Sequence, residues 1–198
     1  MTGSILLGIF IIILVLAAVL VVRTCSRQPT PAMTASVELD KGPRAREYGE
    51  QLSKMIQKET VSSRFDSDKT KYYEFHKILE ELFPLVHKTC EKHVFNGNLL
   101  FKWSGKGKAE PILLMSHQDV VEANGSWEHE PFGGYIDGEG KLWGRGTVDT
   151  KGSLYCIFRS VEELIAEGFQ PEGDVYIASS CTEEFSGEGA PLTVEYLQ

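Results

Sequence analysis

The chain has 198 residues, of which 42% are hydrophobic and 24% are charged, and this ordinary globular mixture excludes a largely disordered protein. Its net charge of −8, without any stripe rich in lysine and arginine, argues against a nucleic-acid-binding surface. Its four cysteines lie far apart and form no CxxC pair, so they predict neither a thiolate zinc site nor a disulfide framework.

An unbroken apolar run at residues 5–22 is the first element of the chain. At about 1.5 Å per residue, a helix of this length nearly spans the hydrocarbon core of a bilayer. Because its start lacks Lys and Arg and the stretch around Cys25 is a poor cleavage site, an uncleaved anchor is favoured over a signal peptide. The domain that follows is predicted to be extracytoplasmic, but Arg23 and Arg27 alone would favour the cytosol, so the side stays open.

Four parts are predicted along the chain. Residues 1–4 are a short N-terminus, residues 5–22 are the membrane helix, and residues 23–42, with their prolines and threonines, are a linker. Residues 43–198 form one α/β domain in which helices alternate with short strands.

Helices are predicted at Arg44–Lys58 and Asp68–His87, because apolar residues recur at helical spacing in both ranges. Asp68 is the predicted N-cap of the second helix. The clearest helix is Ser153–Gly168, whose apolar stripe is closed by a glycine, and another begins at Ala190.

Strands are predicted between these helices. His93–Phe95 and Leu99–Trp103 flank Asn96-Gly97, a strong hairpin signal. Pro111–Met115 is a continuous apolar run, as expected for a strand buried on both faces. Three further strands are predicted at Tyr135–Ile136, Lys141–Trp143 and Asp174–Ser180.

Three clusters of acidic and histidine residues follow apolar runs in the second half of the chain. They lie at Ser116–Val120, Gly144–Gly152 and Thr182–Glu184. Ligands of open α/β sheets bind beyond the carboxyl ends of the strands, so these positions favour a binding site. Together the clusters supply one imidazole and four carboxylates, the kinds of donor that a hydrolytic zinc site uses.

Two of the clusters each have a second explanation. His117 and Asp119 are spaced so that the carboxylate supports an imidazole bound to metal, but a lone pair of this kind is more often structural. Adjacent Glu183 and Glu184 at a strand end either share a cation or face solvent. The recurrence of such groups at three successive strand ends argues against a purely structural origin.

Asp149 follows two glycines that permit a tight loop before a helix. A carboxylate there is placed to bridge two cations, but a helix cap or an Asx turn would explain it equally well. Lys151 is expected either to pair with Asp149 or to be a solvated surface charge.

The segments Ser-His-x-Asp-Val-Val, Gly-Arg-Gly-Thr-x-Asp-x-Lys and Glu-Glu, in this order, resemble the dinuclear zinc aminoacylase/carboxypeptidase peptidases. Within this family the chain is most similar to the carboxypeptidase S and N-acyl-amino-acid hydrolase branch, as Glu59–Ser62 and Trp127–Phe132 also suggest. The resemblance runs from Arg44 to the end of the chain. It implies a three-layer α/β/α sandwich with a mixed sheet, the N-terminal half of a catalytic domain.

The resemblance also implies a role for each site residue. His117 would bind one zinc, Asp149 would bridge two zincs and Glu184 would bind the second, with Co²⁺ or Mn²⁺ as substitutes. The implied catalytic residues are Asp119, which would orient His117, and Glu183, the general base. The family's bridging aspartate is often followed by a cis peptide, which here would be Asp149-Thr150.

The implied reaction is hydrolysis of an amide bond in a peptide or an N-acyl amino acid. The family needs a further carboxylate ligand and a final histidine, and it has a lid domain through which a homodimer would form; none of these can be matched before Gln198. We therefore expect the chain to be the first part of a longer, membrane-anchored enzyme. Taken alone, it is expected to bind metal weakly and to be inactive.

Two other functions stay open from the sequence. One is a non-catalytic, membrane-tethered module with a degenerate metal site, and the other is a metal-dependent hydrolase of esters or cyclic amides. His129 is not expected to replace a ligand, because Trp127–Phe132 has the pattern of a packed loop. His76, His87 and His93 are assigned no role.

Overall fold

The structure is a computed structural model that describes residues 2–27, 42–65 and 67–198. The chain divides into two compact units, an N-terminal one up to Leu39 and a second one from Asp40 onward. Each unit is described by itself.

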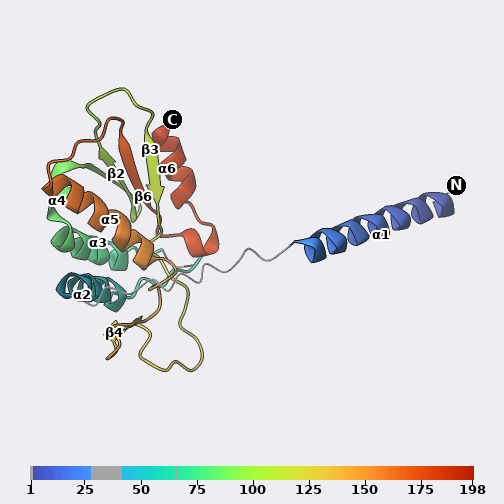
Figure 1. The fold of residues 1–198 in the computed structure, drawn as a ribbon, viewed down its shortest axis with the longest axis horizontal. Helices are drawn as coiled ribbons and strands as arrows, with labels where there is room; N and C mark the ends of the chain where they lie inside the picture. The colour runs from blue at the N-terminus through green and yellow to red at the C-terminus, as the bar shows by residue number, and fades with distance from the viewer. Residues whose placement is uncertain (1, 28–41, 66) are drawn as a thin grey trace. The chain divides into compact units, whose positions relative to one another are not determined.

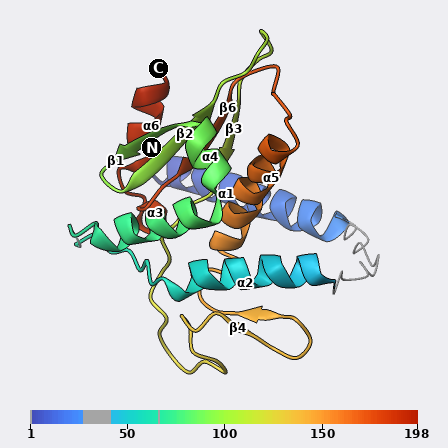
Figure 2. The same ribbon diagram turned by 90° about the vertical axis from the view of Figure 1, so that its left-hand side faces the viewer.

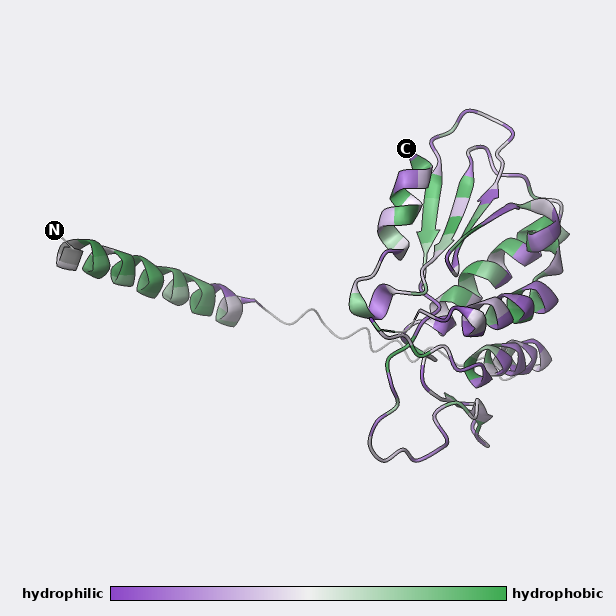
Figure 3. Ribbon diagram, turned by 180° about the vertical axis from the view of Figure 1, so that it is seen from behind, coloured by the Kyte–Doolittle hydropathy of each residue, from purple (hydrophilic) through white to green (hydrophobic). Residues whose placement is uncertain are grey.

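The N-terminal unit contains helix α1 (Thr2–Ser26). Its stretch Ile5–Ser26 is long and apolar enough to cross a membrane, and Figure 3 shows hydrophobic residues along most of its length. The helix is longer than the predicted range 5–22. Residues 23–26, assigned to the linker from the sequence, are helical, since neither proline nor glycine interrupts the chain between Gly8 and Pro29. Residues 28–41 of the predicted linker lie outside the described residues.

The second unit is built on a four-stranded mixed sheet in the order β1-β2-β6-β3. β6 pairs antiparallel with β2 and parallel with β3, with Met115 aligned with Ala178 and Leu99 with Ser179. The C-terminal ends of β3 and β6 therefore lie at the same edge of the sheet, beside the start of β2. The strands are β1 (Glu91–Phe95), β2 (Asn98–Trp103), β3 (Ile112–Met115) and β6 (Val175–Ser179).

The predicted Asn96-Gly97 hairpin is confirmed, and two of the further predicted strands pair as a second hairpin. β1 and β2 are joined by Asn96 and Gly97, whose φ angles of 48° and 86° suit the tight turn that this dipeptide favours. The second hairpin pairs β4 (Tyr135–Ile136) with β5 (Leu142–Trp143) in a separate two-stranded sheet.

The prediction that the Pro111–Met115 strand is buried on both faces is wrong. β3 is the last strand in the order of the sheet, and Ile112 and Met115 are 53% and 69% exposed. A continuous apolar run shows that both faces of a strand are apolar. It does not show which segments of the chain cover them.

Helices lie on both sides of the sheet, which confirms the predicted three-layer arrangement (Figures 1 and 2). Helix α6 lies on one side, and α3, α4 and α5 lie on the other, where their apolar faces form the core with β2 and β6. Buried members of this core include Met55, Phe75, Leu79, Phe83, Phe101, Leu154, Phe158 and Ile177. The helices of this unit are α2 (Pro43–Gln57), α3 (Thr70–Leu82), α4 (Pro84–Thr89), α5 (Lys151–Ala166) and α6 (Gly189–Leu197).

The single helix predicted for Asp68–His87 is in fact two helices, α3 and α4. Pro84 has no backbone N–H and takes the first position of α4, where that N–H is not needed. The N-cap of α3 is Lys69, one residue later than predicted. The carboxylate of Asp68 still accepts a hydrogen bond from the backbone N–H of Thr70, at 2.8 Å.

Candidate metal site

The segment that follows β3 continues to pair with the segment that follows β6. The backbone N–H of Ser116 donates to the carbonyl of Ala178, and that of Gln118 donates to the carbonyl of Ser180, at 3.1 and 2.8 Å. Residues 116–119 therefore leave the sheet beside residues 180–184. Two of the three clusters meet at one edge of the sheet for this reason.

A third segment, residues 60–62, lies along the other side of residues 118–120. The N–H of Val120 donates to the carbonyl of Thr60 at 3.2 Å, and the N–H of Ser62 donates to the carbonyl of Val120 at 3.0 Å. The hydroxyl of Thr60 also donates to the carbonyl of Gln118 at 2.7 Å. These bonds fix the backbone that carries His117 and Asp119 from both sides.

Asp149 reaches the same edge from the loop between β5 and α5. The loop passes close to residue 120 because Gly146, with φ of 92°, has no Cβ; a Cβ there would lie 2.9 Å from the side chain of Val120. The hydroxyl of Ser116 donates to the carbonyl of Thr150 at 3.0 Å. The peptide bond between Asp149 and Thr150 is cis, as the family resemblance implied.

The three predicted metal ligands come together. His117, Asp149 and Glu184 each present a ligand atom, and these atoms all lie within 4.8 Å of one another. Nε2 of His117 is 3.0 Å from Oδ1 of Asp149. Imidazole nitrogen and carboxylate oxygen are both ligands that zinc binds, so these three residues fit such an ion.

The electrostatics of His117 also suit a cation. Burial by itself would lower the pKa of His117, but hydrogen bonds and charge from Asp119 and Asp149 outweigh it and raise the pKa to about 9. The group of carboxylates thus favours positive charge at this point. Burial raises the pKa of Glu184, and the neighbouring Asp149, Asp119 and Glu183 carboxylates act in the same direction. A bound cation would relieve that repulsion.

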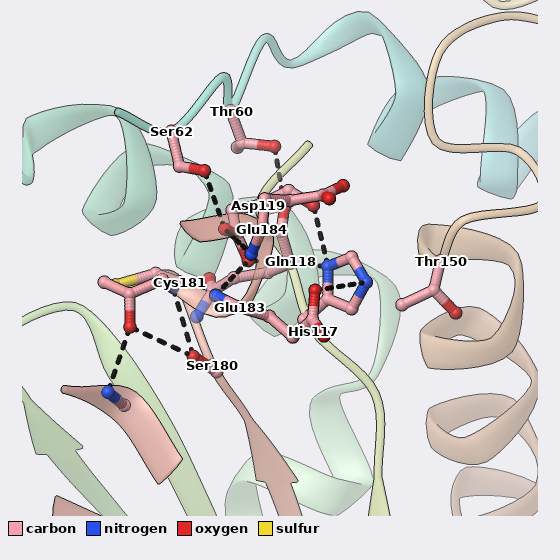
Figure 4. A network of polar contacts seen from close by, with 12 residues as sticks. Thr60, Ser62, His117, Gln118, Asp119, Thr150, Ser180, Cys181, Glu183 and Glu184 are labelled. Atoms are coloured by element: carbon pink, nitrogen blue, oxygen red, sulfur yellow. Dashed lines mark hydrogen bonds and ion pairs between the residues drawn. The ribbon is translucent and has the colours of Figure 1, made fainter. Parts of the chain in front are cut away.

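Asp119 occupies the centre of the hydrogen-bond network in Figure 4. Its carboxylate is fully buried, and it accepts the Ser62 hydroxyl at 2.7 Å and the backbone N–H groups of Glu183 and Glu184 at 3.2 and 3.1 Å. Nδ1 of His117 bonds to the Asp119 backbone carbonyl at 2.9 Å and lies 3.4 Å from its carboxylate.

This network determines the ionisation of Asp119. Burial would raise the pKa of the carboxyl group, but hydrogen bonds from His117, Ser62 and the two backbone N–H groups outweigh burial and lower the pKa. Asp119 therefore stays ionised within the protein. The predicted contact between His117 and Asp119 is present, but the closer partner of Nδ1 is the backbone oxygen rather than the carboxylate.

Glu183 faces the ligand cluster without belonging to it. It begins a short 3-10 helix, Glu183–Phe185, and its side chain is 57% exposed. Its carboxylate oxygen Oε2 lies 3.6 Å from Nε2 of His117. Glu183 is therefore exposed while Glu184 is half-buried, and both lie close to His117.

Sequence reasoning missed a second buried network behind the site. His76 is only 4% exposed, and its Nε2 bonds to the Gln118 side-chain oxygen at 2.9 Å. The Gln118 amide nitrogen donates to the carbonyls of Gly97 and Ser179 at 2.9 and 3.1 Å. The sequence assigns no role to His76. The position of Gln118 between two predicted site residues was the available signal.

Two other expectations concern side chains near the site. His129, which is not expected to be a ligand, packs between the rings of Tyr135 and Trp143. The expectation that Lys151 pairs with Asp149 or lies in solvent is wrong. Lys151 is fully buried, and its Nζ donates to backbone carbonyls instead. Burial lowers its pKa to about 7.

His76 makes stability dependent on pH. Burial lowers its pKa from 6.5 to about 4, so the folded chain keeps it neutral while the unfolded chain protonates it. Stability from this group is complete above pH 6.5 and is lost as the pH falls toward 4; the shift amounts to about 3 kcal/mol. We expect His76→Gln, which does not titrate, to remove this part of the loss in urea unfolding measured across that range. Equal pH slopes for the two proteins would contradict the expectation.

Residues 113–198 match the family described as Peptidase family M20/M25/M40. The matched range includes all five predicted site residues.

Individual relatives cover more of the chain. It is 33% identical over 192 residues to "Probable carboxypeptidase S-like 2" of Dictyostelium discoideum, which covers 92% of this chain and 37% of that protein. It is 35% identical over 209 residues to "N-fatty-acyl-amino acid synthase/hydrolase PM20D1" of Xenopus tropicalis, with 99% and 40% covered. The chain thus spans well under half the length of these relatives.

Among solved structures, human carnosine dipeptidase 1 has a similar fold. The TM-score is 0.63 at 16% sequence identity, and the match covers 77% of this chain and 35% of that chain. This likeness supports the α/β architecture described above.

Proposed function

We propose, from the premise that this chain carries a domain of peptidase family M20/M25/M40, that the whole protein is a zinc-dependent hydrolase of amide bonds in peptides or N-acyl amino acids. The printed names of the two relatives, a carboxypeptidase S-like protein and an N-fatty-acyl-amino acid synthase/hydrolase, support this substrate class. The observation that carries the proposal is the convergence of His117, Asp149 and Glu184 at the C-terminal edge of the sheet.

His117, Asp149 and Glu184 are the proposed metal ligands. Two zinc ions are the proposed complement, with Co²⁺ or Mn²⁺ as substitutes. When bound, zinc lowers the pKa of water and polarises the substrate carbonyl.

The remaining roles fall to the protein itself. Asp119 orients His117. Its backbone carbonyl and its carboxylate both lie against Nδ1 of His117, so that Nε2 faces the ligand cluster. Glu183 is the proposed general base and acid: its exposed carboxylate accepts a proton from the attacking water and delivers it to the leaving amine. The backbone of Glu183 is fixed through its N–H group, which donates to Asp119.

We also propose that α1 is a single-pass anchor and that the domain from Asp40 onward lies on the extracytoplasmic side. The length and hydropathy of Ile5–Ser26 support the anchor. Protease added to intact cells tests the side, since a domain on the outer face of the cell membrane is cut and a cytoplasmic one is not. The proposed assembly is a homodimer that forms through the lid domain of the family. Sedimentation of the full-length protein tests it.

Metal content and substrate range test the proposed function together. After dialysis against zinc, we expect about two zinc ions per full-length protein and one or fewer in the 198-residue chain alone. The full-length protein should hydrolyse dipeptides or N-acyl amino acids, and removal of zinc by a chelator should abolish that activity. Absence of zinc from both proteins would favour a non-catalytic module. Hydrolysis of esters alone would favour the other metallohydrolase.

A further inference from the structure

The amino group of Lys151 is buried among backbone carbonyls. Its side chain is fully buried, and Nζ donates to the carbonyl oxygens of Met55 and Lys58, at 3.0 and 2.6 Å. Nζ also lies 4.9 Å from the centre of the Phe75 ring. Burying an amino group is costly, and an apolar residue of similar size would avoid the cost. What the lysine offers, and an apolar side chain does not, is a pair of hydrogen bonds to backbone carbonyls.

Both acceptors lie at the C-terminal end of α2. Met55 is in the last turn, and Lys58 is the C-cap residue. The last carbonyls of a helix have no partner within it, and the helix dipole gives this end a partial negative charge. Lys151 is the first residue of α5, so one helix start caps the end of another helix.

The end of α2 leads directly into the segment that supports Asp119. Thr60 lies two residues after the C-cap and bonds to the carbonyl of Gln118. Ser62 follows, and its hydroxyl donates to the Asp119 carboxylate at 2.7 Å. The position of the α2 end thus sets the position of the hydroxyl that holds Asp119.

Lys151 is equally close to the loop that carries Asp149. The two residues are separated by Thr150 alone, and the loop also passes over the aliphatic part of the lysine. A Cβ placed on Gly146 would lie 3.4 Å from Cδ of Lys151 and 2.9 Å from the side chain of Val120. The aliphatic part of Lys151 therefore packs under the loop that carries Asp149. Its amino group bonds to the end of α2, which leads into the segment that supports Asp119.

We propose that Lys151 is a positioning residue of the metal site, which joins the loop carrying Asp149 to the segment that orients Asp119. It holds the loop carrying Asp149 and the segment after α2 at a fixed separation, with its amino group bonded to the carbonyls of Met55 and Lys58. This inference rests on the proposed function, because it presupposes that zinc binds at His117, Asp149 and Glu184.

The test compares Lys151→Met with Lys102→Met in the full-length protein. Methionine keeps the length of the side chain and removes its N–H donors. Lys102 is on β2, where it pairs with Asp174 at 2.9 Å near the opposite end of the sheet, so its replacement removes a lysine remote from the site. Zinc affinity is measured by competition with a chelator, and the melting temperature is measured on the metal-free protein. The visible spectrum of the Co²⁺-loaded protein reports ligand geometry.

We expect Lys151→Met to weaken zinc binding by about 10- to 100-fold, as is typical when a residue that supports a ligand is lost. Its cobalt spectrum should change, while its metal-free melting temperature shifts no more than that of Lys102→Met. Zinc affinity within about twofold of the unmodified protein would overturn the inference. A protein that binds no zinc before any substitution would instead overturn the proposed function.

A double variant keeps the inference testable if the methionine variant does not fold. Lys151→Gln retains N–H donors on a shorter side chain, and Ser62→Ala removes the hydroxyl that holds Asp119. If both act through the same segment, their combined effect on zinc affinity should be smaller than the sum of the separate effects. Additive effects would overturn the inference, since independent sites add.

Discussion

Replacing Glu183 with glutamine is expected to lower kcat of the full-length protein by about 10³-fold while its zinc content stays unchanged. Glutamine keeps the size of the side chain but cannot accept a proton from the attacking water. The Glu183 side chain is 57% exposed, so the fold does not depend on its burial. Steady-state kinetics on an N-acyl amino acid, together with metal analysis of the same sample, measures both quantities.

Glu188→Gln is the matched control for this prediction. Glu188 is another carboxylate of the same region, and its side chain bonds to Asn96 rather than facing the ligand cluster. Its replacement should leave kcat nearly unchanged. If Glu183→Gln retains the hydrolysis rate with zinc still bound, Glu183 is not the general base and the proposed mechanism is wrong.

Asp119→Asn is expected to give the largest loss of stability, about 3–5 kcal/mol, as when one partner of a buried charged network is removed. The Asp119 carboxylate accepts the Ser62 hydroxyl and the N–H groups of Glu183 and Glu184. An asparagine has one acceptor oxygen and turns an NH₂ group toward donors, so at least one donor loses its partner. Urea unfolding measures the free energy, and chelator competition should show weakened zinc binding in parallel.

A surface aspartate with similar bonds provides the comparison. Asp137 accepts the N–H groups of Glu139 and Lys141 and the indole N–H of Trp143, and these bonds lower its pKa, but it is only half-buried and begins an exposed turn. Asp137→Asn loses comparable hydrogen bonds where water can replace them, so its cost should be much smaller. Equal losses in the two variants would show that burial at Asp119 is not decisive.

Local patterns in the sequence predicted most of the fold. The Asn96-Gly97 turn and the stripe of Ser153–Gly168 both encode a conformation in neighbouring residues, and both elements are present. The errors arose where one sequence pattern is compatible with more than one structure. Apolar spacing continues through Asp68–His87, yet the missing N–H of Pro84 divides the helix. The apolar run of β3 gave no information about which segments cover it.

The candidate site was predictable to a different extent. The three clusters predicted a site at the strand ends, and the family resemblance implied that His117, Asp149 and Glu184 would meet there. The residues that support them were not predictable. Lys151 bonds to carbonyls more than ninety positions away, and no local pattern tells which distant helix end lacks hydrogen-bond partners. Residue type suggested a charge pair or a solvated charge for this lysine, whereas in the folded chain its amino group bonds to backbone carbonyls.

The exposed strand β3 has a practical consequence for handling the protein. Ile112, Leu113 and Met115 lie uncharged on an outer strand of the sheet, and such strands can pair with the same strand of another molecule. Preparations of the 198-residue chain will therefore tend to self-associate through this edge as concentration rises, independently of the apolar helix at the N-terminus. Purification of the chain by itself calls for low protein concentration or a charged substitution on β3.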